Sequence, residues 1–284
     1  MKTFKQFLTE AKSLNEVSTK YKKGEFGYWW TVIRGEEDIE GKVYNGDIIC
    51  ANKKLTSLKG APKEVKGDFR CGWNKLTSLE GAPKEVSGDF HCWNNNLTSL
   101  KGAPEYVGGD FECGINKLTS LEDRPKEVGG GFGFGYNKLT SLDDCPEEVK
   151  GDFNCQNNKL TSLKGCPKKV KGTFWCPSNK LTSLEGCPQK VKGSFNCANN
   201  KLTTLEGGPE EVKGDFCCSS NKLTSLEGAS EKVGGNFECR YNQLKTLEYC
   251  PKEVGGWFEC SNNEKKFNED EVRSLCNVKG IIIF

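Results

Sequence analysis

The chain has 284 residues, and its 33 Gly, 16 Cys and 35% hydrophobic content differ from an average compact enzyme domain. No apolar run approaches the ~18 residues of a membrane span or forms a secretory core, so we expect a soluble, non-exported protein without a membrane partner. The 41 basic residues balance the 39 acidic ones, which gives no reason to expect nucleic acid as a partner, and the single histidine leaves little for acid–base catalysis.

Residues 1–16 precede the repeats, and they begin with MKTFKQFLTEA. Phe4, Phe7, Leu8 and Ala11 fall on one helical face, which predicts a small amphipathic helix. The same string is similar to the capsid-targeting propeptide of internal head proteins in T-even-like tailed phages. That resemblance implies cleavage after Glu10 in an L-x-E motif, which would leave Ala11 as the new terminus. Both interpretations stay open.

We expect residues 17–45 to form an N-terminal cap, because a solenoid exposes an apolar cross-section at each end. The apolar side chains that can cover the first turn are Phe26, Tyr28, Trp29, Trp30, Val32 and Ile33.

Residues 46–263 repeat the pattern LTSLxGxPxxVxGxFxCxxNK with a period of 21 residues. Two Leu columns, starting at Leu55 and Leu58, continue without a gap to Leu244 and Leu247. Phe and Cys alternate with polar residues, which predicts a short strand with one buried face, while Gly and Pro exclude a helix from the rest of the turn. The pattern predicts about eleven turns and one parallel sheet.

An Asn column from Asn74 to Asn263 lies three residues after the Cys column. An amide there can bond backbone groups of its own turn and of the neighbouring turn, so we expect a buried Asn ladder. This pattern resembles leucine-rich repeats of the short bacterial effector type, with an extra residue before the strand that a Gly-permitted turn or bulge can absorb. The fold class that we expect is a mainly-β leucine-rich-repeat solenoid with a short N-terminal helix and an α/β C-terminal cap.

Residues 264–284 are expected to form that C-terminal cap. Asn268 followed by Glu269, Asp270 and Glu271 predicts a helix N-cap with an acidic first turn, and Val272, Leu275 and Cys276 would pack inward. The tail from Gly280 to Phe284 predicts a closing strand.

Ten of the cysteines occupy one inward column, which runs from Cys50 to Cys260 with Phe134 in place of Cys on one turn. A spacing of 21 residues puts the thiols in a line and not around one point, so we expect buried, reduced packing residues and no metal or cofactor.

The residues that face outward from the strand differ from turn to turn, unlike the rest of the repeat. Exposed aromatic side chains among them are favoured anchors for protein contacts. The candidate partner-binding residues are Trp73, His91, Trp93, Ile115, Tyr136 and Trp175. The alternative is that Trp73 and Tyr136 only cover the rim of the core.

A second outward column carries Asp47, Asp68, Asp89 and Asp110 on consecutive turns. These carboxylates could attract a basic partner or a cation, or each could bond its own backbone in a Gly-Asp turn, the interpretation that we prefer.

We therefore expect a non-enzymatic, monomeric solenoid that binds a host or phage protein through its concave face. The resemblances imply a phage-encoded protein that is packaged in the capsid and delivered to the bacterial host cytoplasm. The alternative is a structural internal component of a phage head.

Overall fold

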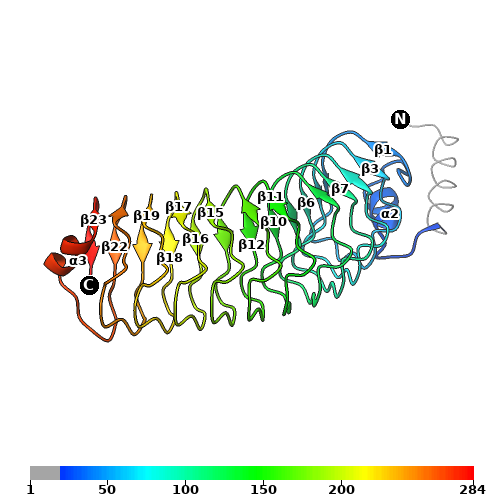
Figure 1. The fold of residues 1–284 in the computed structure, drawn as a ribbon. Coiled ribbons are helices and arrows are strands. Elements are labelled where there is room, and N and C mark those ends of the chain that lie inside the picture. The colour runs from blue at the N-terminus through cyan, green and yellow to red at the C-terminus, as the bar shows by residue number, and fades with distance from the viewer. Residues whose placement is uncertain (1–19) are drawn as a thin grey trace, which may run out of the picture. The chain divides into compact units, whose positions relative to one another are not determined.

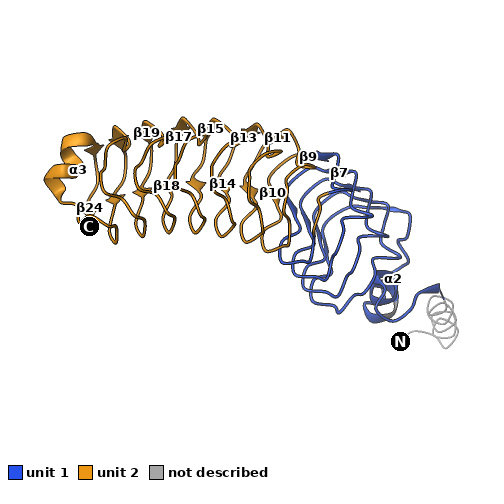
Figure 2. Cartoon of the chain, turned by 60° about the horizontal axis from the view of Figure 1, so that its bottom comes forward, with its two compact units in different colours: residues 1–118, 122–128 blue, residues 119–121, 129–284 orange. Residues whose placement is uncertain are grey.

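The structure is a computed structural model that describes residues 20–284. The predicted N-terminal segment of residues 1–16, with its Glu10–Ala11 cleavage site, lies outside the described residues. The chain divides into two compact units (Figure 2): unit 1 contains residues up to 118 and residues 122–128, and unit 2 contains residues 119–121 and 129–284. Each unit is described by itself.

Unit 1 is built from two parallel ladders of very short strands (Figure 1). The odd-numbered strands pair in chain order and are β1 (Val43–Tyr44), β3 (Glu64–Val65), β5 (Glu85–Val86), β7 (Tyr106–Val107) and β9 (Glu127–Val128). The even-numbered strands do the same and are β2 (Ile48–Ile49), β4 (Phe69–Arg70), β6 (Phe90–His91) and β8 (Phe111–Glu112).

Unit 2 repeats this arrangement. Its odd strands are β11 (Glu148–Val149), β13 (Lys169–Val170), β15 (Lys190–Val191), β17 (Glu211–Val212), β19 (Lys232–Val233), β21 (Glu253–Val254) and β23 (Asn277–Val278). Its even strands are β10 (Phe132–Gly133), β12 (Phe153–Asn154), β14 (Phe174–Trp175), β16 (Phe195–Asn196), β18 (Phe216–Cys217), β20 (Phe237–Glu238), β22 (Phe258–Glu259) and β24 (Ile282–Ile283).

The chain is thus a mainly-β parallel solenoid of about eleven 21-residue turns, as the repeat predicts. The prediction of one strand per turn is incomplete, because each turn contributes two. The second strand ends at the Val column, whose members, such as Val65 and Val170, are buried. Most of these Val side chains are buried, with Val128 half-buried, while their backbones pair with the neighbouring turns.

Stacked apolar columns fill the interior of both units. Successive Phe rings lie 5.5 Å apart between Phe69 and Phe90 in unit 1 and between Phe174 and Phe195 in unit 2. The ten cysteines of the inward column are all at most 2% exposed, which confirms the prediction that they are packing residues. Burial raises the pKa of these thiols, for example that of Cys50 to about 12 and that of Cys71 well above its usual range.

The predicted Asn ladder is confirmed, and Asn200 shows its geometry. Its Nδ2 donates to the carbonyl oxygens of Cys197 (3.0 Å) and Ala198 (3.2 Å) in its own turn and of Cys176 (3.1 Å) in the preceding turn. Its Oδ1 accepts from the backbone N–H of Leu181, 3.1 Å away. One buried amide thus satisfies backbone groups of two turns that no strand pairs.

The Asp column has a related role, which differs from the expected bond to the residue's own turn. Asp47 Oδ1 accepts from the backbone N–H of Asp68 (2.8 Å), and Asp68 Oδ1 accepts from that of Asp89 (2.9 Å). In unit 2, Asn236 occupies the same column, and its Oδ1 accepts from the backbone N–H of Trp257 at 3.0 Å. Each side chain therefore links its turn to the next one.

Glycine before the strand is needed for close stacking. A Cβ on Gly193 would lie 2.6 Å from Thr173 N and 2.7 Å from Gly172 C in the preceding turn, a distance that no side chain tolerates. The expected Gly-permitted bulge is therefore a point of close backbone approach. By contrast, Gly186, which precedes the Pro of the repeat, has a φ of +92° and supplies a left-handed turn.

At its N-terminal end, unit 1 is capped by the short helix α2 (Phe26–Tyr28) and the π-helical segment η1 (Trp29–Ile33). Phe26, Trp29 and Trp30 are buried, and the Phe26 ring centroid lies 6.1 Å from that of Phe69, as expected of a cap. Ile33 is 65% exposed, however, so it does not cover the first turn as predicted.

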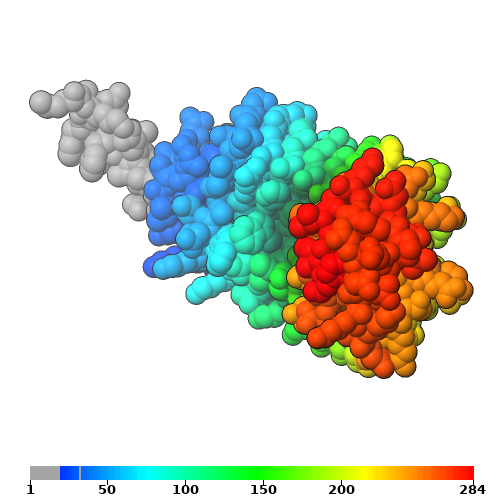
Figure 3. Space-filling view, turned by 90° about the vertical axis from the view of Figure 1, so that its left-hand side faces the viewer, coloured from blue at the N-terminus to red at the C-terminus, as the bar shows by residue number. Residues whose placement is uncertain are grey.

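At its C-terminal end, unit 2 is closed by α3 (Glu269–Leu275), β23 and β24 (red in Figure 3). Asn268 Oδ1 accepts from Glu271 N at 3.0 Å, and the Glu271 side chain accepts from Asn268 N at 3.1 Å, which completes a capping box. Val272 and Cys276 are buried as predicted, whereas Leu275 is 49% exposed. β24 pairs with β22, so the predicted closing strand is confirmed.

Replacing Asn200 with Ala should lower the free energy of unfolding by about 2 to 3 kcal/mol, because buried backbone groups of two turns lose their hydrogen-bond partner. The matched control is Lys201→Ala, which changes the adjacent exposed side chain. Urea denaturation measures both. Equal effects of the two variants would contradict the assigned role of the ladder.

Candidate partner-binding surface

We define the outer face as the side of the even strands opposite the buried Phe column. The second residue of these strands points outward, so His91 is half-buried while Phe90 beside it is buried. Trp73, His91, Trp93 and Ile115, four of the six predicted binding residues, belong to unit 1. His91 and Trp93 alternate with buried residues, and Trp73 contacts Trp93, whereas Ile115 follows the strand of a later turn and its side chain is exposed.

Trp73 and Trp93 form a T-shaped aromatic pair, with ring centroids 5.4 Å apart. They come from adjacent turns but from neighbouring columns, since Trp73 is two residues after its Cys and Trp93 is one residue after its own. The Trp93 indole lies over Gly72 of the preceding turn, where an added Cβ would be 3.2 Å from Nε1. The glycine thus leaves room for the ring.

Trp73 and Ile115 adopt backbone conformations that are costly for their residue types. Their φ angles are +54° and +53°, in the left-handed region that Asn tolerates and a β-branched residue rarely adopts. Asn94, between them in the same column, has a φ of +54°. Both side chains are nonetheless largely exposed, at 55% and 44%, so neither contributes the core burial that would compensate for the strain.

Charged side chains lie in the same two turns as the aromatic pair. Arg70 Nη2 lies 2.8 Å from Asp68 Oδ2, and His91 Nε2 lies 3.9 Å from Asp89 Oδ2. Burial lowers the pKa of His91 more than nearby Asp89 raises it, so the imidazole is neutral at neutral pH. The backbone N–H of Asp89 lowers the pKa of Asp68 and keeps that carboxylate charged.

Tyr136 and Trp175, the other two predicted residues, belong to unit 2. Both are exposed, at 51% and 41%, and Tyr136 has a φ of +58°. They come from turns separated by the turn of Asn154, so the structure does not bring them into one cluster. Tyr241 also has a positive φ and is 55% exposed, and its place in the column of Tyr136 is visible in the sequence.

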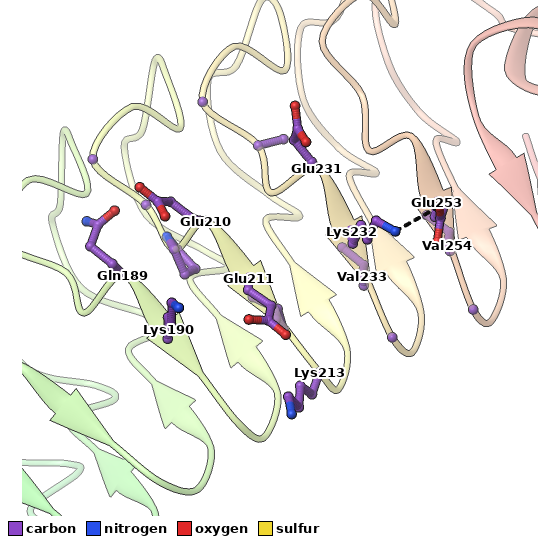
Figure 4. A pocket seen from close by; sticks show the side chains of 18 of the residues that line it. Gln189, Lys190, Glu210, Glu211, Lys213, Glu231, Lys232, Val233, Glu253 and Val254 are labelled. Carbon is purple, nitrogen blue, oxygen red and sulfur yellow. Dashed lines mark ion pairs between the residues drawn. The ribbon is translucent and has the colours of Figure 1, made fainter.

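The opposite, odd-strand side of unit 2 has a hollow of about 1140 Å³ (Figure 4). Its rim carries charges of both signs, with Lys190 in register with Glu211 and Lys232 paired with Glu253 at 2.9 Å. The lining contains no Cys, His or Ser. Opposite charges on neighbouring turns offset each other, so this hollow does not define a ligand.

Metal-binding and membrane-spanning features are both absent from residues 20–284. No group of three or more His, Cys, Asp or Glu side chains in that range is arranged to hold a metal ion. Within the same range, no helix has the length and apolarity needed to cross a membrane.

The fold and this surface together define a leucine-rich parallel solenoid with an aromatic outer face. Its structure is similar to that of YopM from Yersinia enterocolitica WA-314, with a TM-score of 0.47 and 16% sequence identity over 99% of this chain and 74% of that one. No protein-family model matches the sequence, and no curated protein matches it. A similarity of this strength carries no argument about function, which has to come from the surface of the chain itself.

Replacing Ile115 with Asn should raise the free energy of unfolding by about 1 kcal/mol, because Asn adopts the left-handed conformation at lower cost. Ile49→Asn is the control, since Ile49 is also exposed but lies in a strand, where Asn is disfavoured. Thermal or urea denaturation distinguishes them. A loss of stability in both variants would show that the Ile115 side chain contributes to packing.

The thiol of Cys217 should react with a maleimide more slowly than an exposed cysteine at neutral pH. It is half-buried on the outer face of unit 2, and burial raises its pKa to about 11, so little thiolate is present. The labelling rate should rise about tenfold per pH unit until the pKa is reached. Cys217→Ser identifies its contribution by mass spectrometry, and a pH-independent rate would contradict this environment.

Proposed function

We propose that the protein is a non-enzymatic binding module that recognises a protein partner through the outer face of unit 1. The observation that carries the proposal is the Trp73–Trp93 pair, in which Trp73 is exposed and held at a positive φ. Clustered Trp side chains with accessible area are the residues that most often dominate binding at protein interfaces.

The aromatic pair is not needed to complete the core. Asn94 and Asn157 occupy the column of Trp73 on other turns, and Gly114 and Ala198 occupy the column of Trp93. The repeat therefore closes with small or polar residues at these positions. Large rings at two adjacent turns add exposed apolar area at a cost in backbone strain, which is the pattern expected of a functional surface.

Replacing Trp73 and Trp93 together with Ala should weaken partner binding by about 30-fold, the loss expected for a pair of hot-spot residues, while the melting temperature changes little. The measurement is affinity capture from host lysate with the bound protein quantified by mass spectrometry.

The matched control is Tyr106→Ala, which removes a 42% exposed aromatic from the odd-strand side of the same unit. Capture that is unchanged in the double variant, or reduced equally by Tyr106→Ala, would contradict the proposed surface. A large fall in melting temperature would instead assign the two Trp rings to the core.

The N-terminal resemblance adds a proposal about location. A phage-encoded protein with a capsid-targeting propeptide would be packaged inside the head and delivered to the host cytoplasm, where a binding module could reach a host protein. The alternative, a structural component of the head, needs no host partner. The similarity of MKTFKQFLTEA to such propeptides supports both versions, and an ordinary amphipathic helix is the alternative for this segment.

If the propeptide is processed, the chain isolated from phage particles should begin at Ala11. Removal of the preceding residues should leave the melting temperature nearly unchanged, because the described contacts of the cap, which begin with the Lys20–Asp38 ion pair, lie after the cleavage site. N-terminal sequencing of particle-derived protein is the measurement. An intact Met1 in mature particles, or absence of the protein from them, would eliminate the propeptide.

A further inference from the structure

The outer face of unit 1 combines aromatic and acidic side chains along the same turns. Asp89, His91 and Trp93 alternate with the buried Phe90 and Cys92, so all three face outward from one extended segment. At ~3.3 Å per residue, Asp89 and Trp93 are about 13 Å apart along the chain, the reach of a few residues of extended peptide. Asp68 and Trp73 repeat the combination one turn earlier.

We infer that the partner presents cationic side chains, Arg above all, to this face, with a guanidinium against the Trp73–Trp93 pair and another beside the aspartate row. This inference rests on the proposed function and specifies the chemistry of the partner. A guanidinium suits both parts of the surface, because it stacks on an indole and also binds a carboxylate.

Charge complementarity favours this partner over an anionic one. The outer face of unit 1 carries four aspartates, Asp47, Asp68, Asp89 and Asp110. Arg70 pairs with Asp68 at 2.8 Å and lies 3.9 Å from Asp89, so the four acidic charges still outnumber this one guanidinium. The backbone N–H of Asp89 donates to Asp68 Oδ1 and lowers the pKa of that carboxyl, so Asp68 keeps its negative charge beside its neighbours. Phosphates of a nucleic acid or carboxylates of an acidic peptide would be repelled at the distance needed to stack on the rings.

The cap of the same unit already contains the contact that we propose. The guanidinium carbon of Arg34 lies 4.7 Å from the ring centroid of Trp30 and 5.4 Å from that of Trp29. Two indoles in contact thus accommodate an Arg side chain within this chain. On the outer face, Trp73 and Trp93 form a comparable pair with ring centroids 5.4 Å apart, and Trp73 is 55% exposed.

The probe is a short fluorescent peptide in which Arg alternates with Ser, so that an extended chain places all its Arg side chains on one side. Its counterpart has Glu in place of Arg. Fluorescence anisotropy with the full chain should show binding of the Arg peptide that weakens with salt, and at least tenfold weaker binding of the Glu peptide. Equal or tighter binding of the Glu peptide, or of a single-stranded oligonucleotide, would overturn the inference, as would no binding of the Arg peptide.

Variants connect the binding to this surface. Asp89→Asn removes the charge but keeps an oxygen that accepts from the N–H of Asp110, as Asn236 does for Trp257. This variant should lower the affinity for the Arg peptide about fivefold. Trp73→Ala should lower the affinity for the Arg peptide about tenfold or more. The control is Asp215→Asn, the same change in unit 2, which should leave the affinity unchanged.

Failure of this inference differs from failure of the proposed function. If Trp73→Ala abolishes capture of the protein partner while the Arg peptide does not bind or is insensitive to Asp89→Asn, the surface binds a partner of other chemistry. If sedimentation of the full chain shows salt-sensitive self-association that Asp89→Asn removes, a second copy with its own lysines is the occupant, and the inference of a separate cationic partner is wrong.

Discussion

Backbone hydrogen bonding is the constraint on which the whole solenoid depends, because strands of two residues leave most polar groups of a turn without a ladder partner. Backbone bonds between adjacent turns, such as that from Lys180 N to Leu160 O at 2.8 Å, pair some of these groups. The Asn ladder pairs others, as Asn200 does for backbone groups of two turns. The Asp, Ser or Asn before the strand adds one more link to the next turn, and glycine lets the backbones approach closely enough for both. Apolar columns then fill an interior whose dimensions these bonds have set.

These interior hydrogen bonds and apolar columns determine at which positions the residue type can differ between turns. Interior columns repeat with little change because each residue contacts its equivalents in the turns before and after it. The outer-face column of Arg70 is not packed into the interior, so Arg70, His91 and Trp175 can occupy it on different turns. A surface of this kind can acquire aromatic and charged groups one turn at a time without disturbing the hydrogen bonds beneath it.

Much of the fold could be predicted from periodicity alone, because a 21-residue repeat aligns Phe, Cys, Asn and Leu in columns that have only one interior role. The second strand of each turn could not, since Glu64–Val65 and its equivalents are too short to show alternation. The bond from Asp47 to the next turn depends on a register that the pattern does not fix. The positive φ at Trp73 and Ile115 is indicated in the sequence by the Asn and Ser residues that occupy the same column on other turns. The contact between Trp73 and Trp93 needed the structure, because the two rings come from different columns.

The row of buried thiols affects how long the folded protein persists outside a reducing environment. While the turns are stacked, burial keeps these sulfurs protonated and out of reach of oxidants. Once the stack opens, many of the sixteen cysteines become accessible together on a flexible chain, and any mismatched disulfide that forms before the turns realign keeps the chain unfolded. In an oxidising medium, persistence is then governed by the rate at which the solenoid opens rather than by its equilibrium stability.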